Sequence, residues 1–229
     1  MVHLQNVSKS YKNGVNALND ITIDIKDGEF VYVIGETGSG KSTFIKLLDG
    51  ELIPTKGIVE VNGVNVGKLR FSKVPKYRRN IGVVFQDYRL IESKTVFENI
   101  AFALEVINKP RKEIRQRVRK VLEIIDLEDK AKSFPSELSG GQQQRVTIGR
   151  AIANHPKLLI ADEPTGNLDP ERSNEIVELL EKINQESGTT VIMVTHDINL
   201  VNKYRKRTIK FEYGHVVSDS REGGYIAHV

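Results

Sequence analysis

The chain has 229 residues, of which 39% are hydrophobic and 28% charged, a composition typical of a folded globular protein rather than a disordered one. It contains no cysteine, which excludes disulfides, thiolate metal sites and a cysteine nucleophile. The net charge of +4 is mild and spread along the chain, so we expect no nucleic-acid partner, although the same charge suits work beside an anionic membrane.

No apolar run approaches the roughly 20 residues that a membrane span needs. The N-terminal residues also lack the basic region and the apolar stretch of a signal peptide. We therefore expect a cytoplasmic protein, and any contact with the inner face of the plasma membrane must come through a partner.

Residues 4–7 and 17–25 have the character of β-strands. In the second segment, isoleucines alternate with polar side chains, which is the pattern of a half-buried antiparallel strand. Tyr11 stands just before an Asn-Gly turn at 13–14 between the two segments. Its ring is either an edge-strand aromatic or a flat surface on which a nucleobase stacks, and the residues alone leave both possibilities open.

Residues 35–42 read Gly-Glu-Thr-Gly-Ser-Gly-Lys-Ser and match G-x-x-x-x-G-K-[ST] at every fixed position. An apolar run at 30–34 precedes this loop and a helical pattern at 42–48 follows it, which is the context that the motif needs. The amides of such a loop and the helix N-terminus favour phosphate, whereas the alternative is a glycine-rich turn with a chance lysine. The predicted nucleotide-binding residues are Gly35, Glu36, Thr37, Gly38, Ser39, Gly40, Lys41, Ser42 and Thr43.

Residues 57–66, with an Asn-Gly pair at 62–63, predict a β-hairpin. Residues 68–79 are rich in lysine and arginine and predict a solvated connector. Residues 81–85 form a further buried apolar run that ends at Gln86. Because α/β proteins usually bind ligands at the carboxyl ends of their strands, Gln86 is a candidate site residue.

From about residue 88 to 154 the hydrophobic period is helical and no strand interrupts it, so we expect helices inserted into an α/β core. Two apolar stripes consist of Val96, Ile100, Leu104 and Ile107, and of Ile114, Val118, Val121, Leu122 and Ile125. The face opposite the second stripe is predicted to be solvated, with contact to a partner or a lipid headgroup as the alternative. It carries Arg111, Lys112, Arg115, Arg117, Arg119 and Lys120. Residues 138–142, Leu-Ser-Gly-Gly-Gln, are either a second anion site at a helix N-terminus or an ordinary helix start.

The run 158–161 predicts a buried strand that ends at Asp162 and Glu163. A carboxylate there, across the sheet from the glycine-rich loop, suits Mg²⁺-bound phosphates, and Glu163 is placed to accept a proton from an attacking water. The run 191–194 predicts the next buried strand, which His196 follows. A lone histidine is usually structural, but at this strand end it can also point at a γ-phosphate.

Residues 171–184 have a helical pattern between these two strands. Residues 207–211 and 215–217 predict a closing hairpin around Gly214. The residues from 219 to the end are predicted to be loose.

These motifs in one chain resemble the nucleotide-binding subunits of ATP-binding-cassette (ABC) systems, and the resemblance covers almost the whole sequence. It implies an α/β fold of the P-loop NTPase class, with a RecA-like core, an antiparallel β subdomain and an inserted helical subdomain. It also implies a single domain over residues 1–229, with the core at about 1–87 and 155–229 and the helical subdomain at about 88–154.

The resemblance implies ATP and Mg²⁺ as ligands and assigns roles at matching positions. Tyr11 would stack on adenine, and Glu163, His196 and Gln86 would be catalytic. The implied metal ligands are Ser42, Gln86 and Asp162. ATP would join two copies into a homodimer, in which each nucleotide also meets the signature residues Ser139, Gly140 and Gly141 and the loop residue Asp169 of the other copy.

Within this family, residues 83–90 and 134–137 resemble the bacterial cell-division ATPases FtsE, a family that pairs with the membrane protein FtsX and controls cell-wall hydrolases. The alternative is the ATPase of a lipoprotein-release or macrolide-type exporter, which shares most of these features. Gly149 stands where relatives often have alanine, and glycine there is expected to cost up to about 1 kcal/mol of helix stability.

Overall fold

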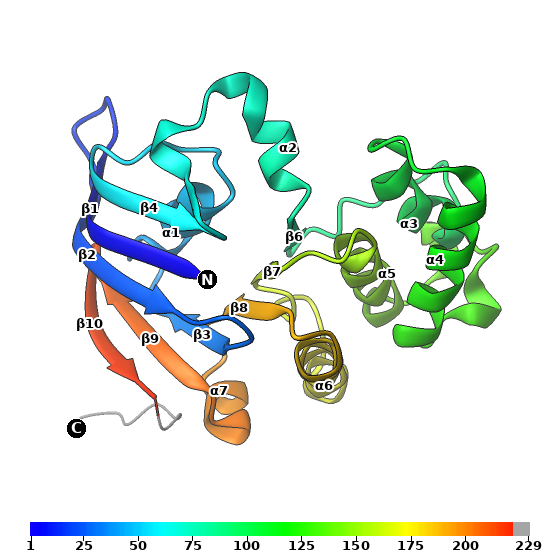
Figure 1. Cartoon of the computed structure of the whole chain (residues 1–229). Helices are drawn as coiled ribbons and strands as arrows, with labels where there is room; N and C mark the ends of the chain where they lie inside the picture. Colours follow the sequence, from blue (N-terminus) through cyan, green and yellow to red (C-terminus); the bar gives the residue numbers. More distant parts are fainter. Residues whose placement is uncertain (222–229) are drawn as a thin grey trace.

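The structure is a computed structural model that describes residues 1–221. At its centre lies a six-stranded sheet in the order β10–β9–β3–β8–β7–β6, parallel except for the pair of β10 and β9 (Figure 1). The strands are β3 (Phe30–Ile34), β6 (Ile81–Val84), β7 (Leu158–Asp162), β8 (Thr190–Val194), β9 (Arg207–Glu212) and β10 (His215–Ser220). Every strand that an apolar run predicts is present, with small shifts at the ends.

Both faces of this sheet are covered, because successive side chains of a strand point to opposite sides. On β3, Phe30, Tyr32 and Ile34 join one hydrophobic cluster, whereas Val31 and Val33 join the other. Residues of β7 and β8 divide between the clusters in the same alternating way. Two buried faces explain why these segments are apolar throughout instead of alternating.

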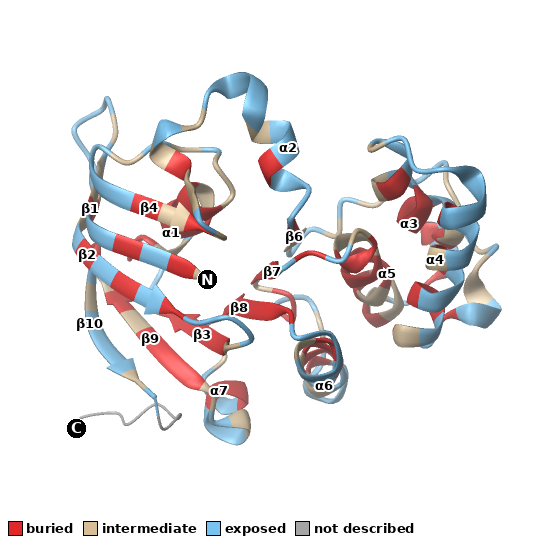
Figure 2. Ribbon diagram, viewed as in Figure 1, coloured by how far each residue is buried: buried red, intermediate tan, exposed pale blue. Residues whose placement is uncertain are grey.

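A four-stranded antiparallel sheet in the order β2–β1–β4–β5 covers one face and shares its cluster with α1 (Lys41–Leu48). Buried and exposed residues alternate along its longer strands (Figure 2). Its strands are β1 (Val2–Ser10), β2 (Asn16–Ile25), β4 (Lys56–Val61) and β5 (Val64–Asn65). The predicted hairpin is shorter than expected, because Val66 begins the 3₁₀ helix η1 (Val66–Lys68), where the Asn65 side chain accepts from the Lys68 amide.

The basic segment 68–79 is mostly exposed, as its charge predicts, but it is partly helical and is fixed at one residue. It contains the short helices η2 (Phe71–Lys73) and α2 (Val74–Arg78). Tyr77 of α2 is buried, and its hydroxyl donates to the Leu48 carbonyl at the end of α1. One buried aromatic therefore fixes a helix whose cations remain on the surface.

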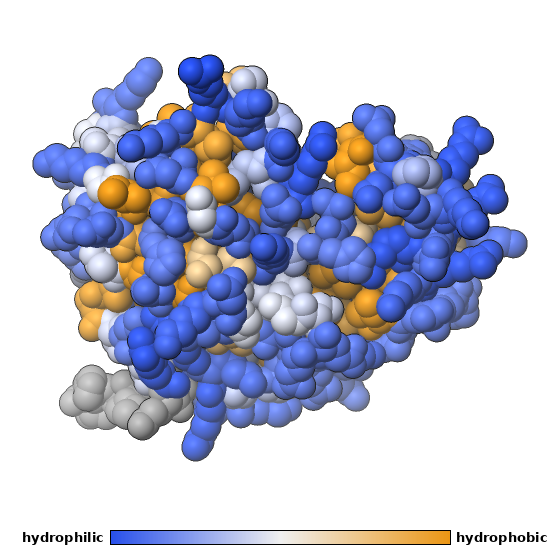
Figure 3. Space-filling view, viewed as in Figure 1, coloured by the Kyte–Doolittle hydropathy of each residue, from blue (hydrophilic) through white to orange (hydrophobic). Residues whose placement is uncertain are grey.

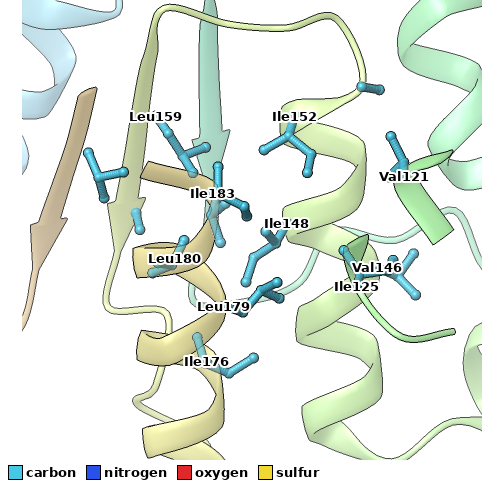
Figure 4. Packing of buried hydrophobic residues seen from close by; sticks show 14 of the residues in the cluster. Val121, Ile125, Val146, Ile148, Ile152, Leu159, Ile176, Leu179, Leu180 and Ile183 are labelled. Atoms are coloured by element: carbon cyan, nitrogen blue, oxygen red, sulfur yellow. The ribbon is translucent and has the colours of Figure 1, made fainter. Parts of the chain in front are cut away.

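On the other face of the six-stranded sheet lie α5 (Gly140–Ile152), α6 (Pro170–Ser187) and α7 (Ile198–Tyr204), and α3 (Val96–Glu105) and α4 (Arg111–Ile124) pack against α5 on its side away from the strands (Figure 1). Two 3₁₀ turns, η3 (Glu128–Lys130) and η4 (Pro135–Glu137), join α4 to α5. Both predicted apolar stripes are confirmed as packing faces in this cluster. Figure 4 shows the side chain of Ile148 on α5 facing Leu179 and Ile183 on α6. The core of the helices is thus continuous with that of the sheet.

Arg117 corrects the prediction of a wholly solvated basic face on α4. Its guanidinium donates to the carbonyls of Ile152 and Ala153 at 2.7 and 2.8 Å. Burial lowers the pKa of this group. The side chain thereby satisfies carbonyls at the C-terminal end of α5, which have no partner within the helix.

The glycine at position 149 has a packing reason that the sequence does not show. A Cβ there would lie 2.8 Å from Ile125 Cδ1 and 3.1 Å from Val121 Cγ1, both of the α4 segment. Gly149 therefore permits α4 to approach α5 closely, and this contact offsets the low helix propensity of glycine.

We expect Gly149→Ala alone to destabilise the fold, because the clash with Ile125 outweighs a propensity gain of up to about 1 kcal/mol. Adding Ile125→Val removes the clashing methyl group, so the double variant should be more stable than the sum of the single changes by roughly 1 kcal/mol. Urea denaturation of the four proteins measures this coupling. Additive effects would contradict the packing explanation.

The C-terminal strand corrects the prediction of a loose tail from residue 219. β10 continues to Ser220, and Asp219 receives two hydrogen bonds from the Arg207 guanidinium at 2.8 and 2.7 Å. Residues 222–229 of the predicted tail lie outside the described residues. Among residues 1–221, no helix is both long and apolar enough to cross a membrane. Figure 3 shows that the viewed face is mainly hydrophilic, with small apolar patches.

Candidate nucleotide-binding site

The predicted site residues gather at one edge of the six-stranded sheet. The parallel strands β3, β8, β7 and β6 are consecutive neighbours, so their carboxyl ends meet at this edge. The glycine-rich loop follows β3 and His196 follows β8. Asp162 ends β7, and Gln86 comes just after β6. Four segments that are distant in sequence thus converge where α/β sheets bind ligands.

The loop after β3 presents unpaired amides at a helix N-terminus. Gly40 caps α1 with a φ of 111°, and no side chain caps the helix. Within residues 1–221, the amides of Lys41, Ser42 and Thr43 donate to no backbone carbonyl. Such amides carry the positive end of the helix dipole and fit a phosphate group.

Neighbouring segments hold this loop too tightly for side chains at two glycines. A Cβ on Gly40 would lie 2.7 Å from the Ala17 carbonyl oxygen, and one on Gly35 would collide with the Phe211 carbonyl. The Gly214 amide donates to the Ser39 carbonyl at 3.0 Å from the turn between β9 and β10. The shape of the loop is therefore set by β2 and β9 as well as by its own sequence.

Lys41 supplies a positive charge inside this loop. Its ammonium donates to the carbonyls of Gly35 and Glu36 at 2.6 and 2.8 Å. Burial lowers the pKa of Lys41, and the nearby carboxylates of Glu163 and Asp162 oppose this shift. The lysine thus stabilises the loop through two hydrogen bonds and lies near the two carboxylates at the end of β7.

Asp162 and Glu163 form an acidic pair at the end of β7. Burial and, to a smaller extent, the charge of Glu163 raise the pKa of Asp162, while Lys41 opposes the shift. Glu163 has a φ of 49°, and its amide donates to the Val194 carbonyl at 3.0 Å. This left-handed conformation is uncommon for a non-glycine residue and ends the extended backbone of β7.

The Glu163 carboxylate is a free acceptor beside a histidine. Its Oε2 is buried and accepts no hydrogen bond from the residues that the structure describes. His196 Nδ1 lies 2.9 Å from this oxygen, although the two groups are not aligned as a hydrogen bond. The His196 side chain is 71% exposed, so it can meet both the carboxylate and a ligand. This arrangement suits proton acceptance by Glu163.

The predicted metal ligands comprise one carboxylate, one hydroxyl and one amide. Gln86 is exposed, and its Nε2 would lie 2.9 Å from a Cβ placed on Gly166. Over residues 1–221, no three His, Asp or Glu side chains converge to hold a metal ion. A small donor set of this kind fits Mg²⁺, which keeps water and phosphate oxygens as its remaining ligands.

Tyr11 lies just beyond the end of β1 and beside the start of α1. Its hydroxyl is 3.1 Å from Thr43 Oγ1, and Lys9 Nζ is 5.7 Å from the ring centroid. The ring thus borders the phosphate-binding loop, where a nucleobase surface would have to lie.

Two of the four remaining predicted residues cap helices, and the other two begin α5. Ser139 caps α5, and its hydroxyl accepts from the Gln142 amide at 3.3 Å. Asp169 caps α6, and the hydrogen bond from the Arg172 amide lowers the pKa of its carboxyl. A Cβ placed on Gly140 or Gly141 would meet Tyr88, Leu168 or Arg172 and no atom of residues 35–43. Within one chain, the ordinary helix start is therefore the role that the contacts explain.

Sequence reasoning missed the residues that hold the loop around Gln86. Asn167 donates to the Gln86 carbonyl at 3.2 Å. Thr147 and Arg150 of α5 donate to the Tyr88 carbonyl at 3.1 and 3.0 Å. No local pattern marks these residues, because their partners are more than 55 positions away.

Known proteins are similar to this chain in sequence and in fold. The ABC transporter family model matches residues 18–166. The chain is 51% identical over 225 residues to the cell division ATP-binding protein FtsE of Streptococcus pneumoniae serotype 2, covering 98% of this chain and 97% of the relative. It is 52% identical over 226 residues to FtsE of Mycobacterium tuberculosis, covering 98% of each.

A solved relative has the same fold and a nucleotide-derived ligand. The dimeric post-hydrolysis state of the ATP-binding cassette MJ0796, bound to ADP and Pi, matches with a TM-score of 0.87 and 39% identity, over 98% of this chain and all of the other. With this match, the predicted P-loop NTPase fold is confirmed. The chain therefore belongs to the ATP-binding proteins of the ABC transporter family, is similar to the FtsE proteins of cell division, and binds and hydrolyses ATP.

Proposed function

We propose that this ATPase drives a shape change in an FtsX-like integral membrane protein and so regulates cell-wall hydrolysis during cell division. The observation that supports this proposal is the 51% identity with a cell division ATP-binding protein along nearly the whole chain. The ATPase would work on the cytoplasmic face of the plasma membrane, where its partner holds it. No nucleic acid takes part.

The site residues have separate roles in this proposal. The loop amides and Lys41 bind the phosphates, and Ser42, Gln86 and Asp162 hold Mg²⁺. When bound, the cation would neutralise negative charge on the phosphate oxygens. Glu163 accepts the proton of the attacking water, because its buried carboxylate oxygen has no other donor among residues 1–221. His196 orients the reacting groups from the neighbouring strand end.

A second copy of the chain completes the site. Ser139, Gly140, Gly141 and Asp169 lie at helix N-termini, which favour anions. We therefore place them against the nucleotide of the opposing copy in an ATP-bound homodimer. The dimeric state of the MJ0796 cassette supports this arrangement.

Depletion of the protein in its source organism tests the cellular role. The proposal expects division or cell-shape defects with lipoproteins correctly placed, and co-purification of an FtsX-like protein from membranes. Lipoproteins stranded in the inner membrane would instead establish the exporter alternative.

Tyr11 offers a test of how the base is held. Tyr11→Ala should weaken both ATP and GTP binding by about 1–3 kcal/mol, since stacking on a ring does not read base edges. Tyr11→Phe loses the hydroxyl near Thr43 but keeps the ring, so it should bind both nucleotides almost normally. Calorimetric titration measures the affinities. Equal losses in the two variants would show that the hydroxyl matters and stacking does not.

A further inference from the structure

The loop that carries Gln86 is fixed from outside by two elements. We define the Gln86 loop as residues 85–90, between β6 and the segment that leads to α3. Its start is held by Asn167, whose amide donates to the Gln86 carbonyl at 3.2 Å. Asn167 lies between Glu163 and the start of α6, so this side of the loop is tied to the end of β7.

The rest of the loop is tied to α5. Arg150 donates to the Tyr88 carbonyl at 3.0 Å and to the Arg89 carbonyl at 2.5 Å. The Thr147 hydroxyl lies 3.1 Å from the same Tyr88 carbonyl and shares its proton with the Gln143 carbonyl. Burial lowers the pKa of Arg150. Because the guanidinium is a charged donor, its hydrogen bonds to these carbonyls are stronger than those of a neutral donor. We call Thr147 and Arg150 the α5 anchor.

The backbone that the α5 anchor holds is not relaxed. Tyr88 and Arg89 have φ values of 34° and 49°, a left-handed conformation that is unfavourable for non-glycine residues. Two such residues in succession persist only where the surroundings hold them in place. The Arg89 guanidinium also lies 3.8 Å from the centroid of the Phe85 ring, which closes the loop on itself. The α5 anchor is therefore placed at the part of the loop that most needs support.

The same loop touches the N-terminal end of α5. The Tyr88 hydroxyl would lie 3.0 Å from a Cβ on Gly140, next to Ser139. One helix thus contacts the Gln86 loop near both of its ends, through Gly140 at the first turn and Arg150 at the last. A movement of α5 as a rigid rod would carry the carbonyls of Tyr88 and Arg89 with it.

We propose that the α5 anchor is a positioning device for ATP hydrolysis, which fixes Gln86 relative to α5 through the carbonyls of Tyr88 and Arg89. Thr147 and Arg150 are positioning residues and do not touch the nucleotide. The inference rests on the proposed role of Gln86 as a ligand of Mg²⁺. It adds a link between α5, which Ser139 caps, and the site at the sheet edge. The link runs through the hydrogen bonds of the α5 anchor and then along the backbone of the Gln86 loop.

Arg150→Ala tests the proposal, with Arg117→Ala as a matched control. Arg117 also donates to two main-chain carbonyls and is also half-buried, but its partners, Ile152 and Ala153, are not in the Gln86 loop. We expect Arg150→Ala to lower kcat roughly 10- to 100-fold through misplacement of Gln86, with ATP affinity little changed. Arg117→Ala should lower the urea midpoint by a similar amount and keep kcat.

Two substitutions of Thr147 give a second test, which stays valid even if Arg150→Ala does not fold. Thr147→Val removes the hydroxyl at constant shape and should lower kcat, whereas Thr147→Ser should restore it. Hydrogen exchange of the amides at 86–90 should become faster in Arg150→Ala and Thr147→Val and stay unchanged in Arg117→Ala. This readout does not require turnover.

The outcomes separate this inference from the proposed function. If Arg150→Ala and Arg117→Ala lose the same fraction of kcat, or Thr147→Val behaves as Thr147→Ser, the α5 anchor is structural only and the inference is wrong. Gln86→Ala completes the test. Full activity in Gln86→Ala would overturn the proposed role of Gln86. If Gln86→Ala is inactive but Arg150→Ala has normal activity, only the proposed role of the α5 anchor is overturned.

Discussion

Lys41→Ala is expected to lower kcat/KM for ATP by roughly 100- to 1,000-fold. The variant loses the full positive charge in the phosphate-binding loop. It also loses the hydrogen bonds to the carbonyls of Gly35 and Glu36, so the loop itself becomes less constrained. ATP affinity by calorimetry and turnover by phosphate release should therefore both fall.

Lys46→Ala is the matched control, since Lys46 lies on the same helix. Its side chain is 44% exposed and pairs with Glu51 at 3.2 Å, away from the loop. Exposed ion pairs contribute about 0–1 kcal/mol to stability, so this variant should fold and hydrolyse ATP normally. Turnover of Lys41→Ala that matched this control would refute the phosphate-binding role of Lys41.

The strand ends were the most predictable part of the candidate site. β6, β7 and β8 have buried residues on both faces, so their sequences are short apolar runs with clear limits. The polar residue that follows such a run must lie at the edge of the sheet, and this places Gln86, Asp162 and His196 without any knowledge of distances. The parallel order of the strands then brings them together.

Features that depend on tertiary contacts could not be predicted in this way. The anchoring of α2 by Tyr77 and the role of Gly149 depend on neighbours that are far away in sequence. Arg117 reads as a surface cation until its carbonyl partners are known. A local signal was overlooked at α7, where Asp197 accepts from the amides of Asn199 and Leu200 and caps the helix.

Glu163→Gln is the second change with a large expected effect. The buried Oε2 of Glu163 lies 2.9 Å from His196 Nδ1, which places it at the neighbouring strand ends with Asp162 and the phosphate-binding loop. Glutamine keeps the size of the side chain but cannot accept a proton from water. A missing general base typically costs about 10²- to 10⁴-fold in rate, so kcat should fall by this order.

ATP binding should survive in Glu163→Gln, because the loop amides and Lys41 are unchanged. The substitution also removes a negative charge that contributes to the raised pKa of Asp162, so repulsion toward an anionic ligand decreases. If two copies enclose the nucleotide and hydrolysis separates them, the variant should accumulate as a dimer in ATP. Size-exclusion chromatography with and without ATP measures this state.

Glu181→Gln is the control for the loss of one carboxylate. Glu181 is half-buried on α6 and pairs with Lys206 at 2.6 Å, outside the strand-end site. This variant should hydrolyse ATP and show no ATP-dependent accumulation of dimer. A Glu163→Gln protein that hydrolyses ATP as fast as this control would overturn the assignment of Glu163 as proton acceptor. A protein that binds ATP, turns over slowly and stays monomeric would retain that assignment and overturn the proposed dimer.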